Sequence, residues 1–413
     1  MESLSLLKCM NEIIHNPLTL EVSRLSERSF TRERKMSFTE AVSFFFDLKK
    51  TSLQTRLNNY FHVFKRGMTM TQQGFSKLRG KFSHKPFEMM LREIVSKEYS
   101  GKYPLETWNG LHVFAVDGSH LQLPNTDELK EIFGTRGEYN QCTSAGISVL
   151  YDVFNGWALD PIITHANMNE RTECEKHISF LRDNLSHINN SLILLDRGYP
   201  SQRLIKSIHD AKMKYLMRCN SAFYPVVDNA PMGNSVVTLP KGLSVRVYKF
   251  LLPCGNTETL LTNLFDAPDA DLSFLYHKRW VIETMYGNLK NIVCLENFSG
   301  RTPNVILQDF WVSMVLINSI AVFQKEANEA IAKKHKYRHR KYEYKVKTSD
   351  LVVTLRERFV FACLRRNKIL SRKQMESVIN TLSLSVSPVR PDRSFPHRRD
   401  NRRRFNLFLK SHL

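Results

Sequence analysis

Apolar residues between positions 37 and 100 recur every three or four residues, which is the spacing of one helix face. The clearest set is Leu53, Leu57, Tyr60, Phe61 and Phe64. Two capping-box patterns, Ser37 to Glu40 and Thr69 to Gln72, mark where helices begin. The pattern therefore predicts three short helices in this region.

The third predicted helix has a basic and polar side. One face carries Phe75, Leu78 and Phe82, and the remaining faces carry Gln72, Gln73, Lys77, Arg79 and Lys81. Three short helices with a basic third one fit a helix-turn-helix-like module, in which these polar residues would contact DNA phosphates and base edges. An ordinary amphipathic helix with a solvated face fits the pattern equally well.

From Leu111 onward the pattern changes to short apolar runs typical of strands. Asn155-Gly156 joins two of these runs and is a strong hairpin signal. Helical patterns at 169–187 and 201–211 separate the later runs. The order predicts an α/β domain with a mixed sheet, whose strands are Leu111–Val116, Ile147–Phe154, Ala158–Thr164, Ser191–Leu195 and Lys214–Arg218.

A β-rich insertion is predicted over residues 220–268, where three β-like runs are separated by Gly or Pro turns. A helical pattern then runs from Asp271 to about Val293. The most apolar stretch follows at Val305–Phe323. Because Gln308, Asp309 and Asn318 interrupt it, the stretch indicates a buried helix rather than a membrane span.

The 413 residues are enough for two or three domains. We expect a helical N-terminal domain at 1–100 and an α/β domain at 101–330. A basic C-terminal region at 331–413 would serve DNA contact or dimerisation, and its Arg-rich stretch 390–404 is expected to be a flexible tail.

The net charge of +20 is divided unevenly along the chain. Residues 1–100 carry 17 basic and 10 acidic side chains, residues 331–413 carry 23 and 6, and the middle carries 20 and 24. Basic ends favour a polyanionic partner, most often nucleic acid, although a merely soluble basic protein has the same balance. Seven cysteines without a C-x-x-C pair, and no signal peptide, fit a reducing cytoplasm.

Asp117 and Asp196 each come at or just past the end of a predicted strand. Open α/β sheets bind ligands at the carboxyl ends of their strands, and carboxylates there are natural ligands for Mg²⁺. Taken singly, each aspartate is better explained as the cap of a turn or helix.

Four polar residues, Tyr276, Arg279, Glu283 and Lys290, fall within a sector of about 60° if residues 271–293 form one helix. A solvated, salt-bridged face is the common explanation for such a stripe. Here Trp280, Ile282 and Leu289 occupy the other directions, which indicates a cleft. Glu283 would then add a third carboxylate to a metal site, and the basic residues would hold phosphate oxygens.

The spacing Tyr276-x₂-Arg279-x₃-Glu283-x₆-Lys290 resembles the Y-R-E-K signature of bacterial insertion-sequence DDE transposases of the insertion sequence 4 family. Asp117 and Asp196, in their Val-Asp-Gly and Leu-Asp-Arg-Gly contexts, resemble that family's two catalytic aspartates. The strings at 73–79 and 295–300 also resemble segments of the family.

This resemblance implies a ribonuclease H-like core with the β-rich insertion, and two Mg²⁺ ions, with Mn²⁺ as a substitute, on Asp117, Asp196 and Glu283. Tyr276, Arg279 and Lys290 would contact terminal phosphates. The implied reaction cuts double-stranded DNA at transposon-end inverted repeats and joins the 3′-hydroxyl ends to target DNA. The implied assembly is a synaptic homodimer in the bacterial cytoplasm, associated with the nucleoid and with no membrane partner.

Two alternatives stay open. A non-catalytic DNA-binding regulator derived from a transposase would keep the fold but is expected to lose a carboxylate or the Arg/Lys pair. An RNA-binding protein rests on charge alone. One departure concerns the way the second DNA strand is cut. Some members of the family that the sequence resembles trap a flipped base on a tryptophan of the insertion while a DNA hairpin forms. No tryptophan lies in 220–268 here, so Phe223, Tyr224, Tyr248 or Phe250 would have to replace it.

Overall fold

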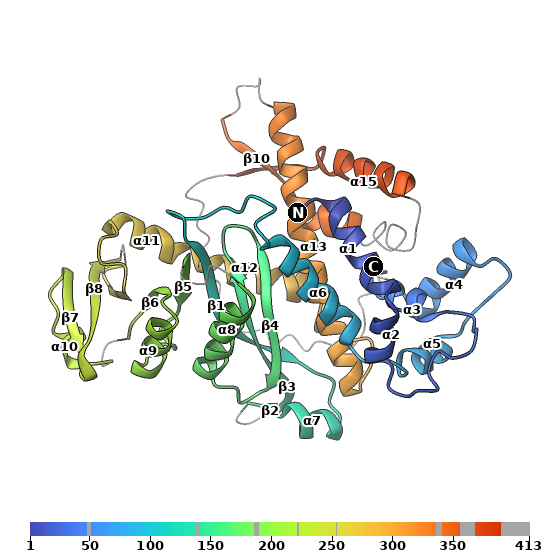
Figure 1. The fold of residues 1–413 in the computed structure, drawn as a ribbon, viewed down its shortest axis with the longest axis horizontal. Coiled ribbons are helices and arrows are strands. Elements are labelled where there is room, and N and C mark those ends of the chain that lie inside the picture. Colours follow the sequence, from blue (N-terminus) through green and yellow to red (C-terminus); the bar gives the residue numbers. More distant parts are fainter. Residues whose placement is uncertain are drawn as a thin grey trace. The chain divides into compact units, whose positions relative to one another are not determined.

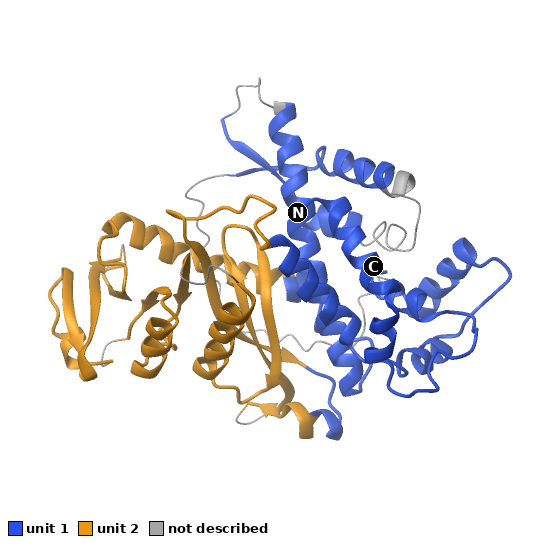
Figure 2. Cartoon of the chain, viewed as in Figure 1, with its two compact units in different colours: residues 1–98, 123–129, 289–413 blue, residues 99–122, 130–288 orange. Residues whose placement is uncertain are grey.

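The computed structural model describes residues 1–47, 51–137, 141–185, 190–220, 223–252, 254–335, 341–355 and 368–389. The chain divides into two compact units, shown in Figure 2. Unit 1 contains residues 1–98, 123–129 and 289–413, and unit 2 contains residues 99–122 and 130–288. The predicted Arg-rich stretch 390–404 lies outside the described residues.

Unit 2 is built on a nine-stranded mixed sheet with the order β2-β3-β1-β5-β6-β9-β8-β7, and β4 pairs with β3 (Figure 1). The α/β prediction is therefore confirmed. The strands are β1 His112–Gln122, β2 Thr135–Arg136, β3 Cys142–Asp152, β4 Trp157–His165, β5 Ser191–Leu195, β6 Lys214–Arg218, β7 Gly233–Leu239, β8 Leu243–Leu251 and β9 Thr257–Thr262.

The centre of this sheet is the parallel set β1, β5 and β6. β5 is buried along its whole length, which explains its uninterrupted apolar sequence. β3 and β4 form the predicted hairpin, and Gly156 in its turn has a φ of 76°, which favours glycine. β1 continues past the predicted end at Val116 because residues up to Gln122 pair with β3.

The three β-like runs predicted within 220–268 form strands that continue the same sheet. β9 pairs antiparallel with β6, and β8 and β7 follow in order. The helices of unit 2 pack on this sheet, with α8 beside α9 and α12 against β1. Their bounds are α8 Glu170–Asn184, α9 Gln202–Asp210, α10 Pro225–Asp228, η2 Pro240–Gly242, α11 Asp269–Lys278 and α12 Trp280–Gly287.

The predicted continuous helix from Asp271 to Val293 is broken in the structure. α11 ends at Lys278, the N–H of Arg279 bonds the carbonyl of Tyr276 in a tightened turn, and α12 follows. Residues Asn288–Ile292 (η3) then form a π-helical turn. Both deviations alter the 100° step per residue, so a stripe calculated for one ideal helix does not hold over this length.

Unit 1 is mainly helical. Its long helix α13 packs against α1, α6, α15 and β10, which forms a two-stranded antiparallel sheet with β11. The bounds are α1 Ser3–His15, α2 Pro17–Ser23, α3 Phe38–Phe44, α4 Leu53–Phe64, α5 Gln72–Arg79, α6 Lys85–Glu98, α13 Pro303–His335, α15 Lys368–Leu382, β10 Glu343–Val346 and β11 Val386–Val389; α7, Asp127–Phe133, crosses the unit boundary.

Helix α13 confirms the predicted buried helix. It is long and apolar enough to span a membrane, yet 83% of its most apolar 18-residue stretch is buried inside the protein. Ile306, Phe310 and Met314 are among its fully buried side chains, and the helix packs with α1 and α6. This packing places residues 289–330 in the same unit as the N-terminal helices, whereas the sequence pattern had grouped them with the α/β domain.

The three short helices predicted at 37–100 are present as α3, α4 and α5, followed by α6. Ser37 and Glu40 form the expected capping box. The second predicted box is wrong, because α5 is capped by Thr71, whose hydroxyl accepts from the N–H of Gly74 at 3.1 Å. A hydroxyl one residue before the helix meets the N–H groups of its first turn, which Thr69 cannot do.

Arg79 has an internal role in unit 1. It is only 6% exposed. Its guanidinium donates to Gln308 Oε1 at 2.9 Å, to Ser299 Oγ at 2.5 Å and to Asp309 Oδ1 at 3.1 Å. The guanidinium therefore uses its donors within the protein, on the segment around the start of α13. Arg79 is not among the residues that we propose to contact DNA.

Arg79→Ala should destabilise the protein by about 3–5 kcal/mol, because it removes the ion pair of Asp309 and leaves Gln308 Oε1 without its donor. Lys77→Ala, in the same helix but exposed, should change stability by less than about 0.5 kcal/mol. Urea unfolding of both full-length variants measures this difference. Equal loss in the two variants would contradict the internal role of Arg79.

Candidate active site and basic hollow

Asp117 and Asp196 lie level with each other on the parallel pair β1–β5. The paired register reaches Ala115 with Leu194, so two further residues along each chain lead to the two aspartates. Neighbouring strands are about 4.8 Å apart. The register therefore places the two carboxylates at adjacent positions. Asp196 follows the end of β5, as predicted, whereas Asp117 lies within β1 and not at its end, because β1 continues in its pairing with β3.

Asp117 is held in a partly buried environment, with a side chain that is 20% exposed. Burial raises the pKa of its carboxyl to about 7, against the lowering effects of the Arg279 guanidinium and the Gly118 N–H. The Gly118 N–H donates to Asp117 Oδ1 at 2.9 Å, and Arg279 Nη1 lies 3.8 Å from Oδ2. A charged Asp117 thus costs free energy that a cation would recover.

Helix α12 brings Glu283 to the same place. The Tyr286 hydroxyl donates to the backbone carbonyl of Asp117 at 2.7 Å, which ties α12 to β1. Glu283 lies one turn before Tyr286, and its Oε1 accepts from Arg279 Nη2 at 2.6 Å. The guanidinium of Arg279 therefore lies between the carboxylates of Asp117 and Glu283.

Tyr276 reaches the second aspartate. Its hydroxyl lies 3.3 Å from Asp196 Oδ1, and the side chain is buried. Burial and the charge of Asp196 raise the pKa of Tyr276, so the phenol stays protonated and acts as a hydrogen-bond donor. Burial opposes the charge of Arg279, but Tyr276, Glu283 and both aspartates outweigh it and raise the pKa of Arg279.

Three of the four stripe residues are thus brought to the aspartates within unit 2. Lys290 is different, because it lies in the π-helical turn η3 and belongs to unit 1. The geometry of unit 2 therefore places Tyr276, Arg279 and Glu283 beside the aspartates. The phosphate contact of Lys290 stays a prediction from its spacing in the motif.

The oxygen donors at this site are of the kind that Mg²⁺ prefers. Among the residues that the structure describes, no three His, Cys, Asp or Glu side chains already stand close enough to hold one ion. Arg279 occupies the space between two of the carboxylates. The buried hydroxyl of Tyr199 has no hydrogen-bond partner within the described part of the chain. The donor set fits a divalent cation that competes with Arg279.

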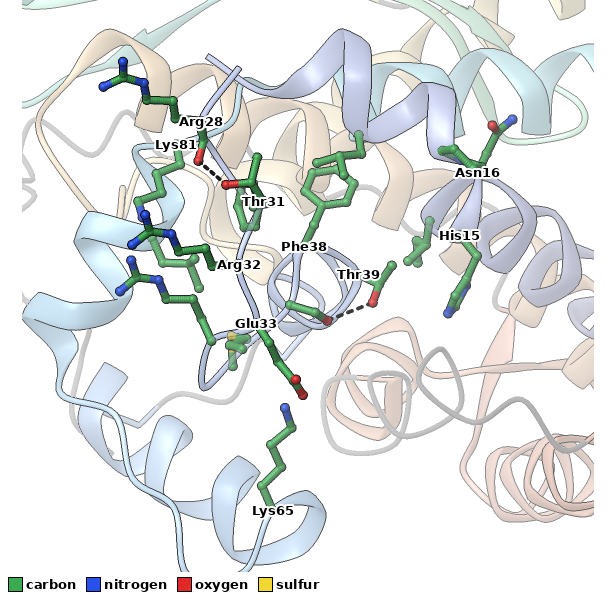
Figure 3. A pocket seen from close by; sticks show the side chains of 18 residues that line it. His15, Asn16, Arg28, Thr31, Arg32, Glu33, Phe38, Thr39, Lys65 and Lys81 are labelled. Atoms are coloured by element: carbon green, nitrogen blue, oxygen red, sulfur yellow. Dashed lines mark hydrogen bonds between the residues drawn. The ribbon is translucent and has the colours of Figure 1, made fainter. Parts of the chain in front are cut away.

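A hollow of about 780 Å³ in unit 1 is lined by basic side chains (Figure 3). Arg28, Arg32 and Lys81 lie together on one side of it, and His15 lies on the other. Its basic and acidic lining residues are His15, Arg28, Arg32, Glu33, Arg34, Lys65 and Lys81. The balance is strongly positive, and only Lys81 was among the DNA contacts predicted from the sequence.

Several of these cations have no anionic partner. Lys65 pairs with Glu40 at 3.0 Å. In the described ranges, the side chains of Arg28, Arg32 and Arg34 make no ion pair, and all three are exposed. The run Arg32-Glu33-Arg34-Lys35 is a sequence signal that could have pointed to this surface. Of the other predicted contacts, Gln72, Gln73 and Lys77 are exposed on α5.

A buried triad elsewhere in unit 2 resembles a serine hydrolase site but is sealed. His177 Nε2 lies 2.9 Å from Ser148 Oγ, and its Nδ1 lies 2.7 Å from Asp160 Oδ2. Ser148 and His177 are 0% exposed, so no substrate reaches the hydroxyl. The buried network instead links β3, β4 and α8 through the side chains of Ser148, Asp160 and His177.

Comparisons with known proteins agree with this geometry. The family described as "Transposase DDE domain" matches residues 108–319. InsZ of Escherichia coli (strain K12), named as a candidate transposase, is 24% identical over 143 residues, which are 34% of this chain and 46% of that protein. The match thus spans about half of the relative's length.

The fold is similar to that of piggyBac transposase, solved by cryo-electron microscopy as a synaptic complex with hairpin DNA. The TM-score is 0.51 at 13% sequence identity, over 91% of this chain and 85% of the other. The family match includes Asp117, Asp196 and Glu283 and covers more than half of the 413 residues. The chain therefore belongs to the transposase DDE domain family.

Proposed function

We propose that this protein is the DNA transposase of a bacterial insertion sequence of the insertion sequence 4 type. It would cut phosphodiester bonds at the transposon-end inverted repeats and join the freed 3′-hydroxyl to target DNA. The observation that supports this proposal is the cluster of Asp117, Asp196, Glu283, Arg279 and Tyr276 beside the carboxyl end of β5 and the middle of β1.

Asp117, Asp196 and Glu283 would hold two Mg²⁺ ions, or Mn²⁺ in their place. Bound there, such ions polarise phosphoryl oxygens and lower the pKa of an attacking water. Of the two carboxylates that pair with Arg279, Glu283 is more exposed than Asp117, with 43% of its side chain accessible against 20%. Glu283 can therefore separate from Arg279 with a small loss of free energy.

The released Arg279 would then bind a phosphate oxygen of the DNA end. A guanidinium donates in a fork that suits phosphate, and this one is held by burial at 4% exposure. Tyr276 would donate from its protonated hydroxyl to a neighbouring phosphate, and Lys290 would add a point charge. The chain's own groups thus bind and orient the DNA end beside the carboxylates.

The basic hollow and α5, both in unit 1, would bind double-stranded DNA in addition to the contacts made at the active site of unit 2. Arg28, Arg32 and Arg34 have the exposure and the free charge that phosphate contacts need. We further propose a homodimer as the synaptic form and a cytoplasmic, nucleoid-associated location. The basic ends of the sequence support DNA binding at neutral pH.

Replacing Arg28, Arg32 and Arg34 together by Gln should weaken binding to end DNA and reduce the slope of log K against log salt by about 2–3. A matched control removes three charges elsewhere through Lys8→Gln, Lys206→Gln and Arg372→Gln, all on exposed i,i+4 pairs. Fluorescence anisotropy over a salt series measures both. Equal slopes for the two triple variants would contradict a role for the hollow.

The function itself is tested with DNA that carries the sequences flanking the reading frame. Full-length protein should cut at the repeat ends in Mg²⁺ or Mn²⁺, leave 3′-hydroxyl groups, and do neither in EDTA. Tight binding without any cleavage in either metal would instead favour the non-catalytic regulator derived from a transposase.

A further inference from the structure

Glu170 is a carboxylate near both aspartates that the motif does not include. It is the first residue of α8, directly after the N-cap Asn169, whose side chain accepts from the N–H groups of Arg171 and Thr172. A helix N-terminus favours a negative charge at this position. α8 packs on β1 and β3, so its first turn lies over the sheet.

The position of the Glu170 carboxylate is defined by two glycines. A Cβ atom added at Gly118 would lie 2.8 Å from Glu170 Oε1, and one added at Gly198 would lie 3.1 Å from Oε2. Gly118 directly follows Asp117, and Gly198 comes two residues after Asp196. The Glu170 carboxylate therefore reaches the backbone beside both aspartates. It occupies space that is open only because glycine, which has no Cβ, stands at both positions.

The charges around Glu170 are negative and only partly balanced. Burial and then the charge of Asp196 raise the pKa of Glu170, while Arg136 and Arg171 lower it. The nearby arginines bond elsewhere: Arg171 Nε donates to the carbonyl of Gly198 at 3.1 Å, and Arg136 Nη1 lies 2.6 Å from His120 Nδ1. In the part of the chain that the structure describes, the Glu170 carboxylate makes no hydrogen bond or ion pair.

We propose that Glu170 is a fourth carboxylate of the active site and holds a divalent cation together with Asp117 and Asp196. This inference rests on the proposed function. Glu283 is bonded to Arg279 at 2.6 Å, whereas Glu170 lies beside the backbone of Gly118 and Gly198 and, within the described residues, pairs with no basic side chain. The charges of Glu170, Asp117 and Asp196 influence one another, although among the described residues no three acidic side chains yet stand close enough to hold one ion. Half-buried negative charges near one another are costly until a cation draws them together.

The test is Mn²⁺ binding to the full-length protein without DNA, followed by the electron paramagnetic resonance signal of free Mn²⁺. Glu170→Gln should weaken Mn²⁺ binding by about 10-fold or more. The control is Glu175→Gln, on the same helix but bonded to Arg203 at 2.7 Å, which should bind like the wild type. Circular dichroism and thermal unfolding in EDTA check that each variant is folded.

Two results separate failure of this inference from failure of the proposed function. If Asp196→Asn weakens Mn²⁺ binding and Glu170→Gln does not, Glu170 is not a ligand but the metal site stands. If neither substitution changes Mn²⁺ binding, or the wild type binds none, both are overturned. Glu170→Asp, with a shorter side chain, should recover part of the affinity lost in Glu170→Gln.

Discussion

Asp196→Asn and Glu283→Gln should each lower the rate of Mg²⁺-dependent cleavage at the transposon end by about 1,000-fold or more. Each substitution keeps the shape of the side chain and removes a negative oxygen donor from the site beside β1 and the carboxyl end of β5. DNA affinity should stay within about 2-fold, because neither residue belongs to the basic hollow. Single-turnover cleavage and anisotropy on the same preparations measure the two effects.

The matched control is Asp210→Asn, an exposed carboxylate of unit 2 that pairs with Lys206 at 2.7 Å. It should cleave at the wild-type rate. If Asp196→Asn and Glu283→Gln cleaved like Asp210→Asn, the assignment of the carboxylates would be wrong. A parallel loss of DNA binding would indicate disturbed folding and would contradict the separation of binding from cutting.

Arg279→Met should destabilise the metal-free protein by about 2–4 kcal/mol. The buried guanidinium is the cation next to both Asp117 and Glu283, and its removal leaves those charges without compensation. Mn²⁺ should restore much of the lost stability, because it supplies the missing positive charge and binds only the folded state. Thermal unfolding in EDTA and in Mn²⁺ measures both parts.

Arg203→Met is the comparison, since Arg203 is 82% exposed and pairs with Glu175 on the surface. It should change stability by less than about 0.5 kcal/mol and show no special response to Mn²⁺. An Arg279→Met protein as stable as wild type in EDTA would contradict the view that Arg279 neutralises the metal-free site. Cleavage by this variant should also fall, because the phosphate contact is lost.

The sheet was the part of the fold most readable from sequence. β5 and β6 begin and end where the apolar runs do, since buried parallel strands need continuous apolar sequence. The prediction that each aspartate lies at or just past a strand end is confirmed for Asp196 and wrong for Asp117, which lies within β1. The π-helical turn at Asn288–Ile292 was not predictable, because it depends on packing and not on local preference.

Contacts between side chains that are far apart in the sequence could not be predicted either. Arg79 looks like an exposed basic residue of a polar helix, yet its partner Gln308 is 229 residues away. Glu170 carries no motif, and only the space beside Gly118 and Gly198 marks it. Thr71 replaced Thr69 as the cap of α5 because both hydroxyls fit the sequence pattern and only the backbone path chooses between them.

The central claim is that Asp117, Asp196 and Glu283 bring a divalent cation to the phosphate that is cut. Its most direct test is cleavage of end DNA whose scissile phosphate carries sulfur in place of one non-bridging oxygen. Hard Mg²⁺ binds sulfur poorly and softer Mn²⁺ binds it better. Cleavage of one sulfur diastereomer should therefore slow strongly in Mg²⁺ and recover in Mn²⁺. Cleavage at the same rate in Mg²⁺ for the oxygen and both sulfur substrates would contradict the claim.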